Sequence, residues 1–225
     1  MKLFYKTISD SGNVRIYFLG IRIAKYYTKK HSLQKKNKTH GKNNIIKFKN
    51  DIIKPEAKIS IYGNNNTVIV DTEAWLNINI NIGLPDCPCD NCTVKIGSGT
   101  LSNGVSLILL ENDTAVTIGE NCMFSNNIQI WGSDTHCVFD NATHELTNIG
   151  KFVHIGNHVW IGTGCYIGKN TFIADNCIVG MASVVTGRIN QQNCVIAGNP
   201  AKIVKRNIDW NHMRPQIYMN NHTHK

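Results

Sequence analysis

Residues 149–185 read IGKFVHIGNHVWIGTGCYIGKNTFIADNCIVGMASVV, and an aliphatic residue returns at every sixth position of this stretch. Glycine directly follows most of these aliphatic residues, and a small or β-branched residue stands four positions after them. A period of six fits neither the roughly 3.6 residues per turn of an α-helix nor the alternation of an ordinary strand, so it indicates a structural repeat. The aliphatic positions are Ile149, Ile155, Ile161, Ile167, Ile173, Val179 and Val185.

The geometry of extended chains turns this repeat into a fold prediction. Residues two apart share a face of an extended segment, so we expect Cys165 and Ile167 to point inward and Tyr166 to point outward. We expect the glycine after each aliphatic residue to let the chain turn sharply without a Cβ clash. Three flat segments then make one triangular coil, and stacked coils bury a column of isoleucine beside a column of small residues. The sequence therefore predicts an all-β fold, a parallel β-helix of the hexapeptide type, whereas a β-sandwich would show no fixed sixfold register.

Length and composition agree with one large globular domain, since the chain has 225 residues of which 42% are hydrophobic. The best early apolar run, Ile16 to Ile23, is short and is interrupted by Arg22, so we expect no transmembrane helix. The early sequence also lacks the pattern of a secretory signal. We therefore expect a cytoplasmic protein.

The net charge of +9 is unevenly distributed. Between Ser11 and Asn50 there are eleven basic residues and no acidic one, whereas the rest of the chain from Asp51 has eleven basic and fourteen acidic residues. This basic segment has two interpretations, a solvated arm or a patch for a polyanion or for anionic lipid headgroups at the inner membrane face. Nucleic acid is not expected, because no recognition module surrounds the segment. The lysines concerned include Lys29, Lys30, Lys35, Lys36, Lys38 and Lys42.

The eight cysteines fall into different contexts. Cys87, Cys89 and Cys92 form the stretch C-P-C-D-N-C, where the repeat is interrupted. A zinc site would need a second pair of ligands at a known spacing, and none follows, so we expect a protruding loop with reduced thiols and no metal. Other cysteines occupy the small inward position of the repeat and should pack in the core. They are Cys122, Cys165 and Cys177.

The repeat breaks once, and the break divides the chain. Six residues beyond Ile130 the register falls on His136, and it returns only at Ile149, so we expect residues 136–148 to form a loop that leaves the β-helix. A short strand is expected over residues 14–23, and the first repeats near Ile59. The predicted organisation is a basic N-terminal segment 1–50, a β-helix domain 51–205 and a C-terminal tail 206–225.

The loop that leaves the β-helix, called the excursion below, begins with Ser-Asp-Thr-His136. Long loops on rigid scaffolds often carry function. His136 lies between Asp134 and Asp140. An imidazole with a neighbouring carboxylate to fix its tautomer has the parts of a general base. We therefore take His136 as a candidate catalytic base and Asp134 as the residue that orients it.

Four motifs now occur in order: Ser-Asp-Thr-His136, IGNHVWIG at residues 155–162, VGMASVVT at 179–186 and AGNPAK at 197–202. Over about residues 118–205 the chain resembles the hexapeptide-repeat acyltransferases, and among them the O-acetyltransferases that modify capsular or lipopolysaccharide sugars, including sialic acid. Two positions depart from the family pattern. Cys137 stands where proline often follows the histidine, and Gly-Met-Ala-Ser183 replaces a common Gly-Ala-Gly-Ser.

The resemblance implies a left-handed β-helix, a homotrimer, and active sites in the clefts between neighbouring subunits. By analogy, His136 deprotonates a sugar hydroxyl, which attacks the thioester of acetyl-CoA directly, with no metal. Trp160 matches a residue at the acceptor and thioester site, and its indole N–H is suited to bind the developing oxyanion. Trimer packing is the other interpretation of Trp160, and the two are compatible.

The same resemblance implies a position for the co-substrate acetyl-CoA. Its pantetheine arm would run along the outside of the coils near Thr163, Met181 and Thr186. Lys202 and Lys205 match positions that meet the CoA phosphates. The sequence leaves three kinds of acceptor saccharide open: a polymer, a lipid-linked unit or a nucleotide sugar. The polymer could be polyanionic.

Two other functions fit the same fold. One is a zinc enzyme of the γ-carbonic anhydrase type, suggested by His154 and His158, although their spacing is four where that family has five. The other is a non-catalytic sugar-binding β-helix, which would need neither the loop histidine nor the AGNPAK motif. The fold alone does not choose among them, because one fold hosts many functions.

Overall fold

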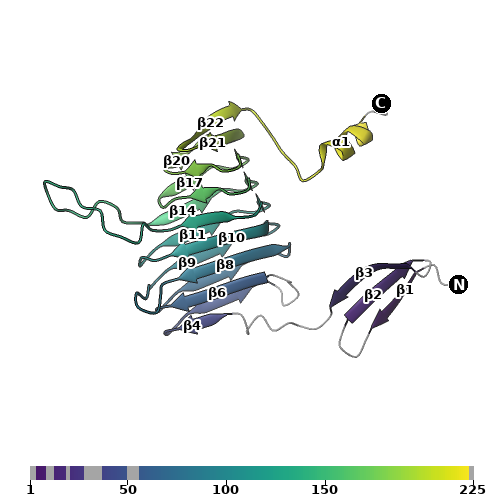
Figure 1. The fold of residues 1–225 in the computed structure, drawn as a ribbon, viewed down its shortest axis with the longest axis horizontal. Helices are drawn as coiled ribbons and strands as arrows, with labels where there is room; N and C mark the ends of the chain where they lie inside the picture. Colours follow the sequence, from purple (N-terminus) through teal and green to yellow (C-terminus); the bar gives the residue numbers. More distant parts are fainter. Residues whose placement is uncertain (1–3, 9–12, 19–20, 28–36, 50–55, 223–225) are drawn as a thin grey trace. The chain divides into compact units, whose positions relative to one another are not determined.

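The chain folds into two units, Met1–Lys35 and Lys36–Lys225 (Figure 1). The smaller unit is an antiparallel sheet of β1 (Phe4–Ile8), β2 (Asn13–Phe18) and β3 (Ile21–Tyr27). The single strand predicted over residues 14–23 is wrong, because this stretch lies on two strands, which pair with Val14 beside Tyr26. The computed structural model describes residues 4–8, 13–18, 21–27, 37–49 and 56–222.

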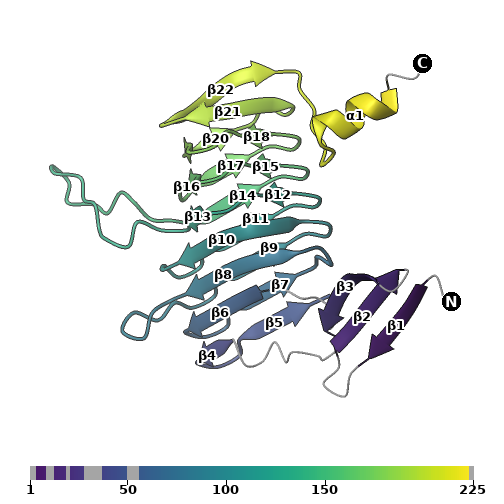
Figure 2. The same ribbon diagram turned by 45° about the vertical axis from the view of Figure 1, so that its right-hand side comes forward.

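The larger unit is a parallel β-helix whose coils stack on one another (Figures 1 and 2). The later coils contribute one strand to each of three walls, numbered here in the order in which the chain visits them, whereas in the earlier coils one long strand follows wall 1, and β10 pairs with strands of both wall 2 and wall 3. Wall 1 consists of β5 (Ile45–Phe48), β7 (Thr67–Val70), β9 (Thr93–Ile96), β11 (Ala115–Ile118), β14 (Phe152–Ile155), β17 (Thr171–Ile173) and β20 (Arg188–Ile189). Wall 2 consists of β12 (Met123–Phe124), β15 (Trp160–Ile161), β18 (Ile178–Val179) and β21 (Cys194–Gly198). Wall 3 consists of β4 (Lys38–His40), β6 (Glu56–Tyr62), β8 (Leu76–Ile82), β10 (Leu101–Leu109), β13 (Ile128–Trp131), β16 (Tyr166–Ile167) and β19 (Val184–Val185).

The predicted inward positions form the core. Six of the seven aliphatic residues of the repeat, from Ile155 to Val185, are fully buried. Ile149 is the exception at 51% exposure, because it lies at the end of the excursion and precedes the strand β14. The small positions are also buried, which confirms the second column of the core. They are Val159, Cys165, Thr171, Cys177 and Ser183.

The glycines of the repeat act differently from the sequence-based expectation. Gly156 and Gly162 do not have positive φ angles; that conformation belongs mainly to asparagines such as Asn170 and Asn176 at the corners. A Cβ atom at Gly162 would lie 2.7 Å from the backbone nitrogen of Met181 in the next coil. Glycine is therefore needed for the close approach of neighbouring coils, while asparagine makes the turn.

The corner between walls 3 and 1 is reinforced by a ladder of side-chain hydrogen bonds. The amide of Asn43 donates to Asn65 over 3.1 Å, Asn65 donates to Asn91 over 3.3 Å, and Asn91 donates to Asp113 over 3.0 Å. All four residues have positive φ, which asparagine and aspartate tolerate better than other residues with a Cβ atom. The ladder ties four successive coils together on the corner from which the protruding loop later leaves.

The β-helix begins earlier than residue 51. Strand β4 pairs with β6 and β5 pairs with β7, so residues 37–49 belong to the coil stack and not to a separate N-terminal segment. Lys38 and Lys42 therefore lie on this unit, while Lys29, Lys30, Lys35 and Lys36 lie outside the described residues. These early coils are longer than the later ones: Lys38 lies beside Ser60, 22 positions on, whereas Trp160 lies beside Ile178, 18 positions on.

The cysteine-rich stretch is less exposed than predicted. Only Cys87 is exposed, in a short turn in which Leu84 and Cys87 exchange backbone hydrogen bonds. Cys89 and Cys92 point into the core, and burial raises the pKa of their thiols to about 12 and about 11. All eight cysteines are free, and the described residues contain no group of three or more potential metal ligands.

The C-terminal residues cap the stack. Strand β22 (Ala201–Arg206) turns back and pairs antiparallel with β21. The chain then crosses back to wall 2 and continues into α1 (Pro215–His222), which projects from the stack (Figure 1). Among the residues that are described, no helix is long and apolar enough to cross a membrane.

Candidate active site

The predicted excursion is a long loop that leaves between β13 and β14 and projects from the stack (Figures 1 and 2). Residues 134–147 are all exposed, which confirms the predicted loop. Its two ends meet at its base, where a Cβ atom on Gly150 would lie only 1.9 Å from the carbonyl oxygen of Gly132. The backbone N–H of Gly150 donates to Glu111 Oε2 over 2.6 Å, an anchor that nothing in the sequence indicated.

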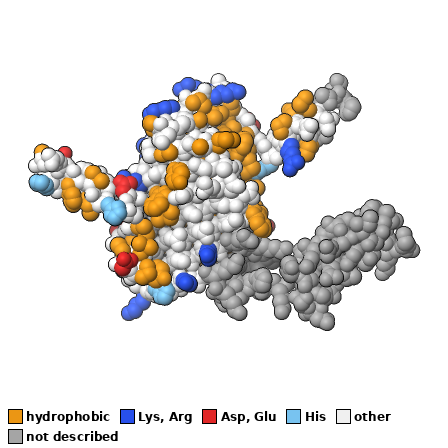
Figure 3. Space-filling model, in the orientation of Figure 1, with side chains coloured by type: hydrophobic (Ala, Val, Ile, Leu, Met, Phe, Trp, Pro, Cys, Tyr) orange, Lys and Arg blue, Asp and Glu red, His pale blue; other side chains and the backbone are white. Residues whose placement is uncertain are grey.

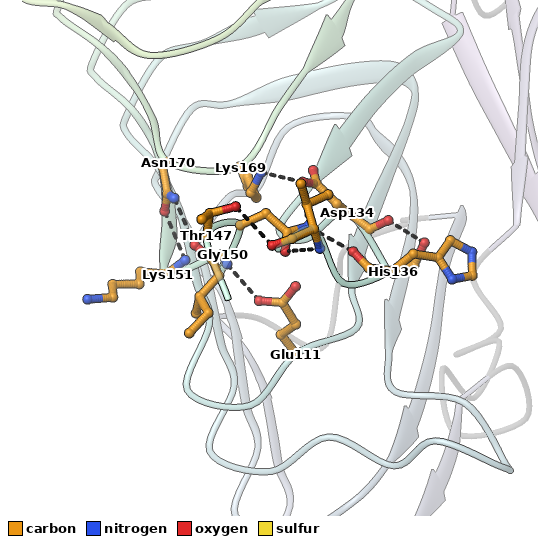
Figure 4. Close-up of polar contacts among 12 residues, drawn as sticks. Glu111, Asp134, His136, Thr147, Gly150, Lys151, Lys169 and Asn170 are labelled. Carbon is orange, nitrogen blue, oxygen red and sulfur yellow. Dashed lines mark hydrogen bonds and ion pairs between the residues drawn. The ribbon is translucent and has the colours of Figure 1, made fainter. Parts of the chain in front are cut away.

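The base of the loop is held by a small polar network (Figure 4). Lys169 Nζ contacts Asp134 Oδ2 at 2.5 Å, and the side-chain amide of Asn148 donates to the same oxygen over 3.0 Å. Asn148 also donates to the carbonyl oxygen of His136 over 2.8 Å and accepts the backbone N–H of Val138 over 2.9 Å. The network fixes the backbone of His136 and leaves its imidazole exposed.

Asp134 does not have the role that the sequence suggested. Its carboxylate contacts Lys169 and Asn148, and the imidazole of His136 points away from it (Figure 4). The hydrogen bond from Lys169, with a smaller contribution from Asn148, lowers the pKa of Asp134. Asp140 accepts backbone N–H groups of Ala142 and Thr143 in the same loop. Within this chain, Asp134 is therefore a residue that shapes the loop and does not orient the histidine ring.

Trp160 lies on β15 of wall 2, between Met123 and Ile178 in the neighbouring strands. Its indole nitrogen is buried and has no hydrogen-bond partner in the described part of the chain. A buried N–H without an acceptor costs about 1–3 kcal/mol. Such a donor is suited to a ligand oxygen that arrives at this position.

The C-terminal tail packs next to Trp160, which sequence reasoning missed. The ring of Trp210 stacks on His158 with centroids 4.2 Å apart, and it meets the ring of Trp160 at 6.0 Å and 47°. Trp210 is only 8% exposed, and its indole N–H donates to the backbone oxygen of His158 over 2.9 Å. The tail after residue 206 is therefore part of the surroundings of Trp160. The tryptophan in the tail was the available signal.

The two histidines that suggested a zinc enzyme have other partners. His154 lies on wall 1, where its Nδ1 is 2.8 Å from Thr117 Oγ1 and its ring stacks on Phe172 at 4.8 Å. His158 lies at the corner between walls 1 and 2 and is held by Trp210 and by Asn176, at 3.1 Å from Nδ1 to Oδ1. These contacts are typical of packed histidines and do not favour the zinc alternative.

The predicted CoA-binding residues occupy two neighbourhoods. Thr163 and Met181 lie one above the other at the corner between walls 2 and 3, where Ala182 N donates to Thr163 O over 2.8 Å. Met181 is 78% exposed. Lys202 lies near this corner, beside Ala197 at the end of β21, and Lys205 lies further along the same strand pair. Thr186 lies apart, at the corner between walls 3 and 1.

A single chain does not bring His136 and Trp160 together. His136 is carried by the corner between walls 3 and 1, and Trp160 lies on wall 2, which is the side of the triangular coil opposite that corner. The loop also projects away from the stack (Figure 1). A site that uses both residues therefore needs a second copy of the chain.

Known proteins share this fold and part of this sequence, although no protein-family profile matches the chain. A polysialic acid O-acetyltransferase of Escherichia coli O1:K1 / APEC is 34% identical over 107 residues, which are 48% of this chain and 34% of that relative. The solved polySia-specific acetyltransferase NeuO superimposes with a TM-score of 0.63 and 27% identity, over 80% of this chain and 89% of its own. The solved polysialic acid O-acetyltransferase OatWY superimposes with a TM-score of 0.62 and 28% identity, over 83% of this chain and 96% of its own. The chain resembles polysialic acid O-acetyltransferases.

This similarity confirms the family resemblance that the sequence motifs indicated. It also confirms that the β-helix is left-handed. The match to the curated polysialic acid O-acetyltransferase spans about a third of that relative's length, 34%. The two solved polysialic acid O-acetyltransferases, by contrast, are matched over most of their chains.

Proposed function

We propose that the chain transfers the acetyl group of acetyl-CoA to a hydroxyl of an acidic bacterial surface saccharide, in active sites shared between neighbouring copies. The observation that carries this proposal is the placement of two unused groups. His136 presents an exposed imidazole on a loop whose backbone is fixed, and Trp160 holds a buried N–H without an acceptor. His136 supplies a base for the acceptor hydroxyl, and Trp160 supplies a hydrogen-bond donor for the carbonyl oxygen of the acetyl group.

The reaction assigned to these residues is direct transfer. The neutral imidazole of His136 takes the proton of the sugar hydroxyl as its oxygen attacks the thioester carbonyl carbon. The indole N–H of Trp160 donates a hydrogen bond to the carbonyl oxygen as negative charge develops on it. When the C–S bond breaks, the imidazolium returns its proton to the departing thiolate. Asp134 contributes indirectly by holding the base of the loop through Lys169 and Asn148.

The surface next to Trp160 fits the donor. Thr163 and Met181 form an exposed ledge at the corner between walls 2 and 3, suited to an extended pantetheine chain. Lys202 and Lys205 on β22 are exposed and suit the phosphates. Thr186 lies at a different corner of the same coil, so it contacts the donor only if the cleft includes the neighbouring copy.

The protruding loop supports a trimer. Three apolar side chains near its tip are exposed, at 52% for Val138, 57% for Phe139 and 43% for Leu146 (Figure 3). Apolar side chains gathered on an exposed loop indicate a partner surface. In a closed ring, each loop contacts wall 2 of the next copy, so the apolar side chains of every loop are covered. The resemblance implies a ring of three copies.

The acceptor is assigned by chemistry and by the relatives' names. The relatives at 34%, 27% and 28% identity are described as acting on polysialic acid, an acidic polymer of sugars. The present chain has a net charge of +9, which favours a polyanionic acceptor. We therefore assign the acceptor to acidic saccharides, with polysialic acid as the first compound to try.

The test is acetyl transfer by the full chain. We expect release of free CoA that depends on polysialic acid, with an acetyl ester on the recovered polymer in its NMR spectrum. A neutral polymer such as dextran is the matched control. Binding of polysialic acid without CoA release would contradict the proposal and would favour the non-catalytic sugar-binding β-helix.

A further inference from the structure

Wall 3 carries a polar hollow that the acetyl-transfer site does not use. It has a volume of about 410 Å³ and lies on the outer face of β4, β6, β8 and β10. Its lining is two lysines together with asparagine and serine side chains. These residues, called the polar track below, are Lys38, Lys58, Ser60, Asn79, Asn81 and Ser106.

The strand register shows that the polar track continues toward the protruding loop. Lys58 lies beside Asn79, Asn79 beside Ser106, Ser106 beside Gln129, and Gln129 beside Tyr166. Neighbouring strands are about 4.8 Å apart, so these four steps span roughly 19 Å. That length accommodates several units of a sugar chain.

The end of this face that lies nearest to the loop is aromatic. The indole N–H of Trp131 donates to Gln129 Oε1 over 3.0 Å, and Gln129 Nε2 donates to the hydroxyl of Tyr166 over 3.4 Å. Gln129 thus fixes two aromatic side chains, and Tyr166 is 44% exposed. Aromatic faces with polar edges suit sugar rings, which have an apolar face and hydroxyl groups around it. Trp131 is five residues before His136 in the chain.

The charge on this face indicates the sign of the ligand. The strands β4, β8, β10 and β13 contain no acidic residue, and β6 contains one, Glu56 at its start, which is not among the residues that line the hollow. No ion pair involves Lys38 or Lys58 among the described side chains. Lysine ammonium groups bind carboxylates, and the asparagine and serine side chains can both donate to and accept from sugar hydroxyls. A wall built for packing against another copy would instead be mainly apolar at its centre.

We propose that the outer face of wall 3 is a binding track for an acidic saccharide chain, which it leads from Lys38 and Lys58 to the aromatic pair at the base of the loop that carries His136. This proposal rests on the proposed function, because it assigns the track to the acceptor of that reaction. It adds a second contact region, remote from the reacting hydroxyl. Affinity should therefore rise with the length of the saccharide chain.

The test compares two double variants with equal change in charge. Lys38→Gln with Lys58→Gln alters the track, and Lys47→Gln with Lys95→Gln alters two exposed lysines that share one column of wall 1. Because two contacts of exposed lysines with carboxylates are lost, we expect about a tenfold weaker Kd for long polysialic acid in the track variant. We expect the Kd of the track variant for a sialic acid dimer to change little. The Kd of the wall 1 variant for long polysialic acid should also change little.

Direct binding to long polysialic acid, without acetyl-CoA, separates this inference from the proposed function. Weaker binding by the track variant alone supports the inference even if no acetyl group is transferred. Equal affinity of the two double variants overturns it, even if both proteins acetylate the polymer. A DNA oligonucleotide of equal charge that binds the wild type as tightly, and loses affinity equally in the track variant, also overturns it by showing a general polyanion site.

Discussion

The indole N–H of Trp210 donates a hydrogen bond to the backbone oxygen of His158 over 2.9 Å, joining residues that are 52 positions apart in the chain. The same contact stacks the two rings at 4.2 Å and brings Trp210 against Trp160. The C-terminal tail thus closes over the one wall on which the proposed oxyanion donor lies.

Replacing Trp210 should release the tail. Trp210→Ala removes a ring that is 92% buried, and losses of this kind lower the free energy of unfolding by about 3 kcal/mol. Because the tail lies at one end of the stack, we expect local opening before global unfolding. Hydrogen exchange at the Ile208 amide, which donates to the Asn193 carbonyl, should become much faster. Val204→Ala, at a 62% exposed position on β22, is the control, and equal exchange in both variants would contradict the prediction.

Replacing His136 should remove the chemistry and keep donor binding. His136→Ala is expected to lower kcat by roughly 10²–10⁴-fold, the usual contribution of a general base, with the KM for acetyl-CoA nearly unchanged. His144→Ala, in the same loop, is the matched control and should retain activity. Steady-state rates of CoA release measure both. Near-normal turnover in the His136 variant would remove this residue from the mechanism.

Mixing two inactive variants should restore activity if the site is shared. His136→Ala and Trp160→Ala chains, co-expressed in equal amounts, would assemble at random into rings. About a quarter of the clefts would then contain both native residues, so we expect about a quarter of the wild-type rate. Separately purified variants, mixed only after assembly, serve as the control. A mixture that stays as inactive as the single variants would show that both residues act within one chain.

The base of the loop should loosen in acid. The pKa of Asp134 is lowered from its usual 3.8, chiefly by the hydrogen bond from Lys169, so this contact stabilises the loop above the usual pKa and is lost as pH falls through the lowered one. Protease cleavage within residues 136–148 by an acid protease should therefore accelerate below about pH 4. The protease should cleave the loop of the Asp134→Asn variant rapidly at every pH tested. Asp140→Asn, which alters only the tip, should keep the wild-type pH dependence at the base.

The close approach of coils at Gly162 should make even one added methyl costly. Gly162→Ala would place a Cβ atom 2.7 Å from the Met181 nitrogen, and overpacking of this kind destabilises by about 1–3 kcal/mol. Gly104→Ala, where the nearest atom would be 3.6 Å away, should have little effect. Thermal unfolding monitored by circular dichroism would compare them. A Tm for Gly162→Ala that matches the Gly104 variant would show that the coils can separate without cost.

The sequence alone was sufficient for the regular half of the fold. From Ile155 to Val185 the inward residues recur every six positions, because each wall uses a two- or three-residue strand and a fixed corner, and a buried column tolerates no change of register. The break at His136 likewise predicted the protruding loop. The first coil, residues 37–49, escaped detection because the early coils are longer, so that Lys38 pairs 22 positions on and the period of six disappears.

The tertiary structure decided which polar side chains meet. Asp134 is two residues from His136, yet its carboxylate contacts Lys169, 35 positions away, because the corner of the next coil lies directly beside the base of the loop. Trp210 reaches His158, and Lys58 lies in one column with Asn79 and Gln129, for the same reason. A local pattern determines on which face of the chain a residue lies. Its partners are set by coil length and by the path of the tail, which are properties of the stacked structure and not of any short stretch of sequence.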